Sequence, residues 1–399
     1  MEIKKPKEGN LFMEKKNNTT SIAIGIACVW MGTHFGPGVA SGTQILQYWV
    51  KYGIWGTLCS ILAMGLLGYC LYCSMEFSRI HKTYNYGDWI QKVFGFKWVS
   101  ILFDVSFIIT CMTALGGSLN AIATLMLNQF GINYWVGVGL VIVCTALLCA
   151  YGAKLVAKAS SYMMYLVLGV LAMIIVLAMT TGKMDLAGAL AAPAAGVTPS
   201  LPKALWSAVI YAAFQATVIA NISSVANQLP NRSTSKKAAI FGIGGNALML
   251  VALSLFLLSF TTLTDYNVLD TKANPLPFYG ILNYLGFGWA KVVYVVTVFV
   301  AVLSTAVGFC FGGLARFSKF YRKADEVTPG KDIALVAVLL LACALCSKFG
   351  IVALVSTGYT ILGYVNLPIL ILPAIFLAGR KISKKYLAEK GIEAPGIDE

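Results

Sequence analysis

The chain has 399 residues, of which 58% are hydrophobic and 12% are charged. A typical soluble domain carries about 25% charged residues, so this composition excludes an ordinary soluble protein and predicts an all-α polytopic membrane protein. The formal net charge of +14 does not indicate nucleic-acid binding, because the lysines and arginines lie in short connections between apolar runs. Basic residues in such connections set the orientation of the membrane helices and contact anionic lipid headgroups.

The first apolar segment, residues 21–50, follows a polar and basic tail at 1–20 and contains four glycines and one proline within residues 32–42. Proline removes a backbone donor, and glycine costs about 1 kcal/mol relative to alanine inside a helix. Unpaired backbone at membrane depth persists where it lines a cavity, and many secondary transporters build their sites in this way. We therefore expect a helix broken near residues 34–40, although small-x3-small glycine spacing also suits close helix packing.

The remaining apolar runs each have roughly the 20 residues that a helix needs to cross a bilayer. With the first segment they predict ten transmembrane helices, at 21–50, 54–76, 98–128, 133–152, 159–181, 203–229, 236–262, 289–315, 332–347 and 355–379. In this arrangement 24 of the 30 lysines and arginines fall on the side of the N-terminal tail. The excess predicts that both termini are cytoplasmic, in a multi-pass protein of a bacterial cytoplasmic membrane.

The ten spans divide into two halves that begin on opposite sides of the membrane, as in an inverted repeat. The predicted organisation is a basic tail (1–20), a first repeat (21–182), an outer connection (183–202), a second repeat (203–380) and a cytoplasmic tail (381–399). The first span of the second half carries polar side chains between residues 214 and 224, so we expect a second broken helix near 215–223. A long outer connection at 263–286 is a candidate lid.

A sequence resemblance extends these expectations. The stretch Gly36-Pro-Gly-Val-Ala-Ser-Gly-Thr-Gln-Ile-Leu resembles the first helix of the YkvI-like bacterial membrane proteins, which carries a similar Gly-x-Gly-[Phe/Val]-Ala-Ser-Gly-Gln-Glu pattern. Over nearly its full length the chain is similar to the LeuT-fold transporters of the amino acid–polyamine–organocation superfamily. The resemblance implies a five-plus-five inverted repeat with discontinuous helices 1 and 6. Here Thr43-Gln44 replaces the usual Gln-Glu, which removes an acid beside the break.

Residues near the two breaks are the candidates for substrate binding. After the first break, the outer half-helix opens with N–H groups and a positive dipole end, which suit a carboxylate. Polar side chains of the sixth span would contact the substrate's polar head or, alternatively, bond to neighbouring helices. The third span passes the site in this fold. The candidates are Gly36, Gly38, Val39, Ala40, Ser41, Gly42, Ser118, Asn120, Phe214, Gln215, Asn221 and Ser223.

A sodium site is implied by the resemblance. In sodium-coupled relatives a Ser/Thr pair of the eighth span binds the ion together with carbonyls from the break of the first span. The matching residues here are Gly32, Phe35, Ala301, Ser304 and Thr305. Alternatively, the hydroxyls of Ser304 and Thr305 bond back to the preceding helical turn.

Two isolated titratable residues are candidates for proton coupling instead of sodium. His34 lies within the broken stretch, and histidine titrates near neutral pH. Asp104 lies inside the third span, where a carboxylate is a functional candidate by default. The alternative for Asp104 is a pair with Lys154 or Lys158 near the membrane interface.

Together these patterns favour a secondary transporter that moves a small organic solute by alternating access with sodium. An amino acid or a related carboxylate-bearing metabolite is the favoured substrate class. The alternative is a proton-coupled or uncoupled exchanger on the same fold, and a channel or membrane enzyme is less favoured. We expect no enzymatic activity, Na⁺ with no organic cofactor, membrane lipid and a small-molecule substrate as partners, no nucleic acid, and a monomer or weak homo-oligomer.

Overall fold

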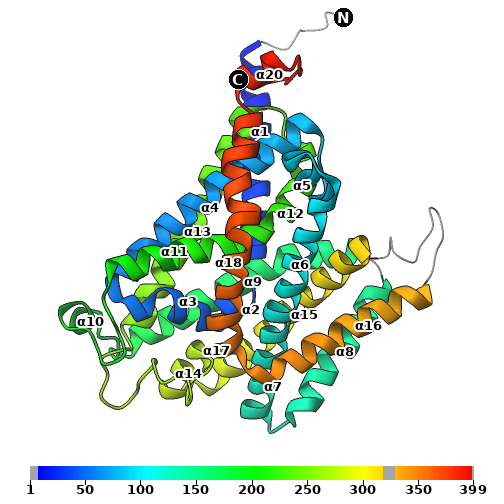
Figure 1. The fold of residues 1–399 in the computed structure, drawn as a ribbon. Helices are drawn as coiled ribbons and strands as arrows, with labels where there is room; N and C mark the ends of the chain where they lie inside the picture. The colour runs from blue at the N-terminus through cyan, green and yellow to red at the C-terminus, as the bar shows by residue number, and fades with distance from the viewer. Residues whose placement is uncertain (1–7, 152, 318–328, 398–399) are drawn as a thin grey trace, which may run out of the picture.

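The computed structural model describes residues 8–151, 153–317 and 329–397, and it describes side chains for 19–149, 165–314, 316–317 and 330–397. All regular secondary structure in this part of the chain is helical (Figure 1). Helices occupy the ranges in which the sequence predicts membrane spans.

The first half of the chain supplies α1 to α10. Their bounds are α1 (Glu8–His34), α2 (Pro37–Ala40), α3 (Thr43–Tyr48), α4 (Gly53–His81), α5 (Tyr86–Phe94), α6 (Ser100–Thr110), α7 (Gly116–Phe130), α8 (Tyr134–Tyr151), α9 (Ala153–Thr180) and α10 (Leu186–Ala191). A π-helical turn at Cys111–Leu115 joins α6 to α7 into one continuous helical segment.

The second half supplies α11 to α20. Their bounds are α11 (Leu201–Gln215), α12 (Ile219–Val225), α13 (Arg232–Leu258), α14 (Pro277–Tyr284), α15 (Gly288–Phe317), α16 (Pro329–Cys346), α17 (Ile351–Ala353), α18 (Tyr359–Asn366), α19 (Gly379–Lys381) and α20 (Lys384–Glu389). Three π-helical segments connect α17, α18 and α19, so that the last apolar span is helical throughout.

Several of these helices have the length and composition of membrane spans. Among the described residues seven segments qualify, namely Thr43–His81, Lys97–Phe130, Leu201–Gln228, Arg232–Leu258, Gly288–Leu314, Gly330–Phe349 and Ile351–Lys381. Tyr134–Cys149 and Tyr165–Thr180 are shorter apolar helices. Large apolar side chains such as Leu62, Leu248 and Phe376 are 55%, 72% and 66% exposed on the outer surface. An apolar surface on many helices requires lipid around it, so the chain is a multi-pass membrane protein.

The interior is built on close contacts of α4 with α13 and α11, and of α1 with α13. Glycines permit this approach. A Cβ atom on Gly242 would lie 2.1 Å from the ring of Trp30, and a Cβ on Gly68 would lie 2.2 Å from the side chain of Ile243. Both distances are impossible for real atoms, so these positions require glycine for the helices to pack as they do.

The first span is interrupted twice. α1 ends at His34, and the chain resumes as α2 with Pro37 at its first turn and Gly36 in an extended conformation before it. A second interruption follows at Ser41 and Gly42, where Gly42 has a φ of +83°. Proline cannot continue the hydrogen bonding of α1, and only glycine adopts this φ without strain, so the residue types account for both interruptions.

The sixth span differs from the expectation of a broken helix near 215–223. α11 passes into a 3-10 turn at Ala216–Val218 and then into α12, so the helix changes type but does not leave its helical path. The physical reason is composition, since residues 203–229 contain neither glycine nor proline. Polar side chains alone do not remove a backbone donor.

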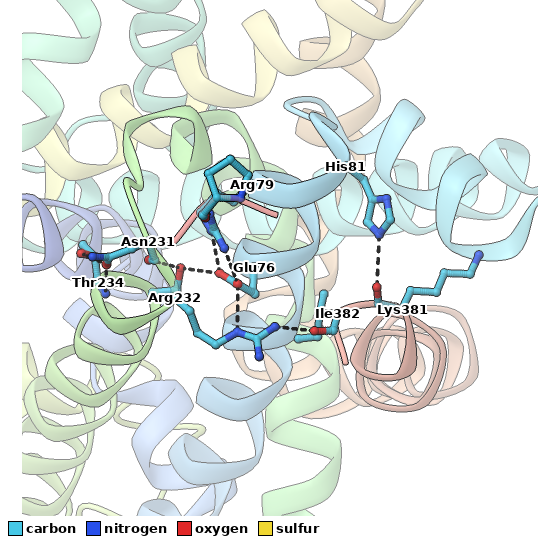
Figure 2. A network of polar contacts seen from close by, with 10 residues as sticks. Glu76, Arg79, His81, Asn231, Arg232, Thr234, Lys381 and Ile382 are labelled. Carbon is cyan, nitrogen blue, oxygen red and sulfur yellow. Dashed lines mark hydrogen bonds and ion pairs between the residues drawn. The ribbon is translucent and has the colours of Figure 1, made fainter. Parts of the chain in front are cut away.

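One end of the molecule carries the start of α1, α5 and α20, whereas α10 and α14 lie at the other (Figure 1). At the first end Glu76 of α4 is fully buried (Figure 2). Its carboxylate accepts from Arg79 at 2.7 and 2.9 Å, from Arg232 at 3.1 Å and from Ser235 at 3.0 Å. The two arginines continue to carbonyls of the C-terminal segment, Arg79 to Pro395 and Arg232 to Ile382. The network therefore joins α4, α13 and the C-terminal segment.

Candidate functional site

A chain of buried polar side chains crosses the break of the first span. Asn246 of α13 donates from Nδ2 to the carbonyl of Gly242 at 2.7 Å, so its Oδ1 accepts from His34 Nδ1 at 2.5 Å. The other ring nitrogen, His34 Nε2, then accepts from the Tyr211 hydroxyl at 2.7 Å. That hydroxyl in turn accepts from Gln44 Nε2, also at 2.7 Å. The pattern satisfies every group with a neutral histidine, so the end of α1 is tied to α13, α11 and α3.

Aromatic rings surround this polar chain on the side of α11 and α18. Tyr211 contacts Tyr48, Trp49 and Phe214, with ring centroids 5.3, 4.7 and 4.9 Å away. Phe214 stacks on Tyr359 of α18 at 4.7 Å. Such walls of aromatic rings with a few polar groups are typical of small-molecule sites.

Gly38 lies at the centre of this region. A Cβ atom on Gly38 would be 2.7 Å from Gln44 Oε1 and 3.6 Å from the hydroxyl of Tyr359. The backbone of α2 thus faces one amide and one hydroxyl directly, with no side chain between them. A substrate bound at this position would meet Gly38, Gln44 and Tyr359 together.

The amides after the break are largely engaged with the backbone. The N–H groups of Val39 and Ala40 donate to the Gly36 carbonyl at 3.0 Å, and that of Ser41 donates to the Pro37 carbonyl at 2.8 Å. Among the N–H groups at the start of the half-helix after the first break, those of Val39, Ala40 and Ser41 are therefore already paired in this conformation. An anionic group would rely on the side chains around Gly38.

The connection at 263–286, which the sequence predicts to be a lid, packs onto the part of the first span that follows its break. Thr43 donates its hydroxyl to the Pro275 carbonyl at 2.8 Å, and the Phe278 amide donates to the Ser41 carbonyl at 3.2 Å. A Cβ on Gly42 would lie 3.1 to 3.2 Å from Pro277 and Phe278. Glycine at this position therefore allows α14 to cover the second interruption.

The candidates of the third span, on α7, which packs against α2, bond to backbone groups of the third span itself and of the last two spans. Ser118 donates its hydroxyl to the Ala114 carbonyl at 2.6 Å, one turn earlier. Asn120 donates to the Ser347 carbonyl at 3.1 Å and accepts from the Ile351 amide at 2.8 Å, so it fixes the start of the last span. Both contacts explain these residues as helix-packing groups.

The candidates of the sixth span separate into buried and exposed residues. Phe214 and Gln215 are buried beside Tyr211, close to the break of the first span. Ser223 is fully buried, and its hydroxyl has no partner within the described part of the chain. Asn221 is exposed on α12. Only Phe214 and Gln215 therefore share a neighbourhood with Gly38.

The sodium candidates come from α1 and α15. Thr305 bonds back from its hydroxyl to the Ala301 carbonyl at 3.0 Å, as the alternative interpretation predicts. Ala301 and Phe35 are buried, and Gly32 is exposed. α15 packs against α2, and Tyr294 of α15 donates to the Ala40 carbonyl at 2.9 Å. The eighth span thus lies beside the interrupted segment.

Asp104 pairs with Arg316, a residue that neither interpretation of the sequence names as its partner. Its carboxylate forms a two-pronged ion pair with the guanidinium of Arg316 at the end of α15, and Tyr86 donates to it at 3.4 Å. The side chains of Lys154 and Lys158 lie outside the described residues. Because both carboxylate oxygens are held by arginine, Asp104 serves to join α6 to α15.

Comparisons with known proteins bear on the fold of the chain. YkvI of Bacillus subtilis (strain 168), an uncharacterized membrane protein, is 24% identical over 343 residues, which cover 86% of this chain and 92% of YkvI. A mutant of the manganese transporter of Eremococcus coleocola superposes with a TM-score of 0.54, at 12% identity over 98% of this chain and 86% of that one. A Na⁺-coupled sialic acid symporter in a substrate-bound, outward-open state superposes with a TM-score of 0.54. It is 14% identical, and the match covers 88% of this chain and 78% of that one.

The chain is a homologue of YkvI with the LeuT fold. No protein-family model matches it. Both solved structures are secondary transporters, and at these identities the likeness shows the shared fold.

In this LeuT-fold chain, sequence reasoning missed three residues of the site. Asn246 and Tyr211 hold His34, and Gln44 appears in the sequence only as a replacement for an acid. Asn246 carries a usable signal, since an amide in the middle of an apolar span demands a hydrogen-bond partner. Tyr211 carries none, because an isolated tyrosine in a membrane helix is as often an interfacial anchor.

Proposed function

We propose that this protein is a secondary active transporter of a small organic solute, with ten transmembrane helices in an inverted five-plus-five repeat (21–182 and 203–380). The observation that carries the proposal is the interrupted first span. Gln44 and Tyr359 lie directly against its backbone at Gly38, which is bordered by the aromatic rings of α11. Interrupted helices of this kind form transporter sites because they bring unpaired backbone and polar groups to the middle of the membrane.

The proposed orientation places both termini in the cytoplasm, with the connection at 183–202 outside. The lysine and arginine bias supports it. The location of α20 at the same end as the start of α1 is in keeping with an even number of crossings (Figure 1).

The proposed substrate is an amino acid or a related carboxylate-bearing metabolite. Gln44, Gln215 and the Tyr359 hydroxyl offer hydrogen bonds to polar groups, and Phe214 offers an apolar wall. The test is a thermal-shift screen of the purified protein against amino acids and small carboxylates, with and without sodium. We expect a stabilising ligand whose effect grows with sodium, because a ligand that binds only the folded state raises its stability. Stabilisation by no member of the panel, in either condition, would contradict this substrate class.

Sodium is the proposed coupling ion, bound by Gly32, Phe35, Ala301, Ser304 and Thr305. Its support is the end of α1 at His34, because the last carbonyls of a helix lack intrahelical partners and are available to an ion. The location of α15 beside α2 adds to it.

Replacing Ser304 and Thr305 together by alanine is expected to raise the sodium concentration needed for uptake. An ion ligand affects substrate affinity only through the coupling free energy, typically 1–3 kcal/mol or about 5- to 150-fold. Uptake into proteoliposomes at increasing sodium measures this, and excess sodium is expected to restore part of the rate. His34→Gln is the control, for which we expect a nearly unchanged sodium dependence.

The alternative is a proton-coupled or uncoupled exchanger on the same fold. It is favoured by His34, which is 2% exposed and bonded through both ring nitrogens to α13 and α11. Protonation would reverse the hydrogen bond at Nε2 and disturb Tyr211 and Gln44. Uptake that ignores sodium but follows an imposed pH gradient would replace sodium by His34 as the coupling group.

A further inference from the structure

A cavity of about 270 Å³ lies at the end of the molecule that carries α20. It is enclosed by the end of α4, by α5 and by the segment that follows the last span. Its basic residues are His81, Lys82, Lys92 and Lys381, and its apolar residues include Ile80 and Ile392. These residues come from parts of the chain about 300 positions apart, so folding alone brings the lysines together.

Hydrogen bonds to the backbone hold two of these side chains, Lys381 and His81. Lys381 donates from Nζ to the carbonyls of Lys92 and Val93, both at 2.9 Å, and so caps the C-terminus of α5. His81 donates from Nε2 to the Lys381 carbonyl at 3.4 Å, a contact visible in Figure 2. Lys82 ends α4 with a φ of +54°. One side of the cavity is therefore held in place without a ligand, and the exposed side chains of Lys82 and Lys92 border it.

The positive charge of the three lysines exceeds the negative partial charge at the C-termini of α4 and α5. A helix C-terminus carries about half an elementary negative charge, and the ends of α4 and α5 together supply about one. Three lysines face them. The ion pairs found in the described ranges use Glu76 and Asp104 and none of these lysines. A positive potential therefore remains in a cavity that also offers apolar surface.

We propose that this cavity binds a phosphate group. Lysine ammonium groups are compact charges with three donors each, which suits a tetrahedral anion held from several sides. Basic pockets at the cytoplasmic ends of membrane helices bind lipid headgroups, and a free phosphate offers the same chemistry. Phe96 and Trp98, 59% and 63% exposed in the segment after α5, place the pocket beside an interfacial aromatic pair.

The test removes two of the charges in the full-length protein. The variant Lys82→Asn with Lys92→Gln keeps Lys381 in its cap, and asparagine tolerates the left-handed backbone at position 82. The matched control is Lys236→Gln with Lys237→Gln, two lysines of α13 outside the cavity. Native mass spectrometry in detergent, with added phosphatidylglycerol or phosphatidylcholine, measures lipid retention for each protein. Thermal melts check that every variant is folded.

We expect the native chain and the control to retain phosphatidylglycerol in preference to phosphatidylcholine. The cavity variant should bind it about 30-fold more weakly, because each lysine near the headgroup contributes about fivefold. Displacement of the lipid by inorganic phosphate, lost in the cavity variant, would support the proposal with free phosphate as the ligand. Equal retention by both variants, or retention of neither phosphatidylglycerol nor phosphate by the native chain, would overturn it.

Discussion

Valine at position 38 is expected to lower substrate affinity by about 5- to 150-fold while leaving the protein folded. The first methyl-bearing carbon would occupy the space 2.7 Å from Gln44 Oε1, and the branches would extend toward the Tyr359 hydroxyl. The displaced Gln44 amide would no longer pair with the substrate, and leaving one buried polar group unpaired costs about 1–3 kcal/mol, which corresponds to this range of affinities. The measurement is the ligand-induced shift in melting temperature for the compound identified by the substrate screen, followed by uptake into proteoliposomes.

Gly65→Val is the matched control, because a Cβ on Gly65 meets no atom within 4 Å. Gly38→Ala provides a milder change in which only the flexible end of Gln44 must move. We expect graded losses from alanine to valine at position 38 and none at position 65. Normal ligand binding by a folded Gly38→Val protein would place the substrate site elsewhere.

Removal of the Glu76 carboxylate is expected to destabilise the protein by about 3–5 kcal/mol, the usual cost of breaking a buried ion pair from one side. Glu76→Ala would leave Arg79 and Arg232 facing each other without the charge that both now share. The Ser235 hydroxyl would also lose its acceptor. Thermal and denaturant unfolding in detergent measure the loss.

The control for this change is Glu389→Ala, which removes an exposed carboxylate from α20 at the same end of the molecule. An exposed charge of this kind contributes about 0–1 kcal/mol. Glu76→Gln is expected to lie between the two, since it keeps acceptors for the arginines without the charge. Equal melting temperatures for Glu76→Ala and Glu389→Ala would show that the network does not stabilise the fold.

Helix positions could be predicted from sequence because a helix needs about 20 apolar residues to cross a bilayer. Clusters of charged residues mark the ends of these helices. The interruption of the first span could also be predicted, because Pro37 and Gly42 determine the backbone conformation locally. The sixth span shows the limit of the same reasoning. The polar side chains of Gln215 and Asn221 indicate that hydrogen-bond partners are needed there. They do not indicate that the helix backbone is broken.

Side-chain partners were much less predictable. Asp104 pairs with a residue 212 positions away, and His34 pairs with Asn246 across the same sequence distance. Several basic residues lie at one end of the bundle, and topology alone does not choose among them. Lys154 and Lys158 are candidate partners of Asp104 because all three lie near the predicted membrane interface. In the structure, the packing of α15 against α6 brings Arg316 to Asp104 instead.

The network at Glu76 has a consequence for biogenesis. Glu76 and Arg79 lie three residues apart on α4, so they neutralise each other as soon as that helix forms. Arg232 joins them only after α13 has been synthesised, and the carbonyls of Ile382 and Pro395 follow the last span. The local ion pair thus lowers the cost of inserting α4 before its other partners are made, and the later contacts become possible only after α13 and the last span have been synthesised.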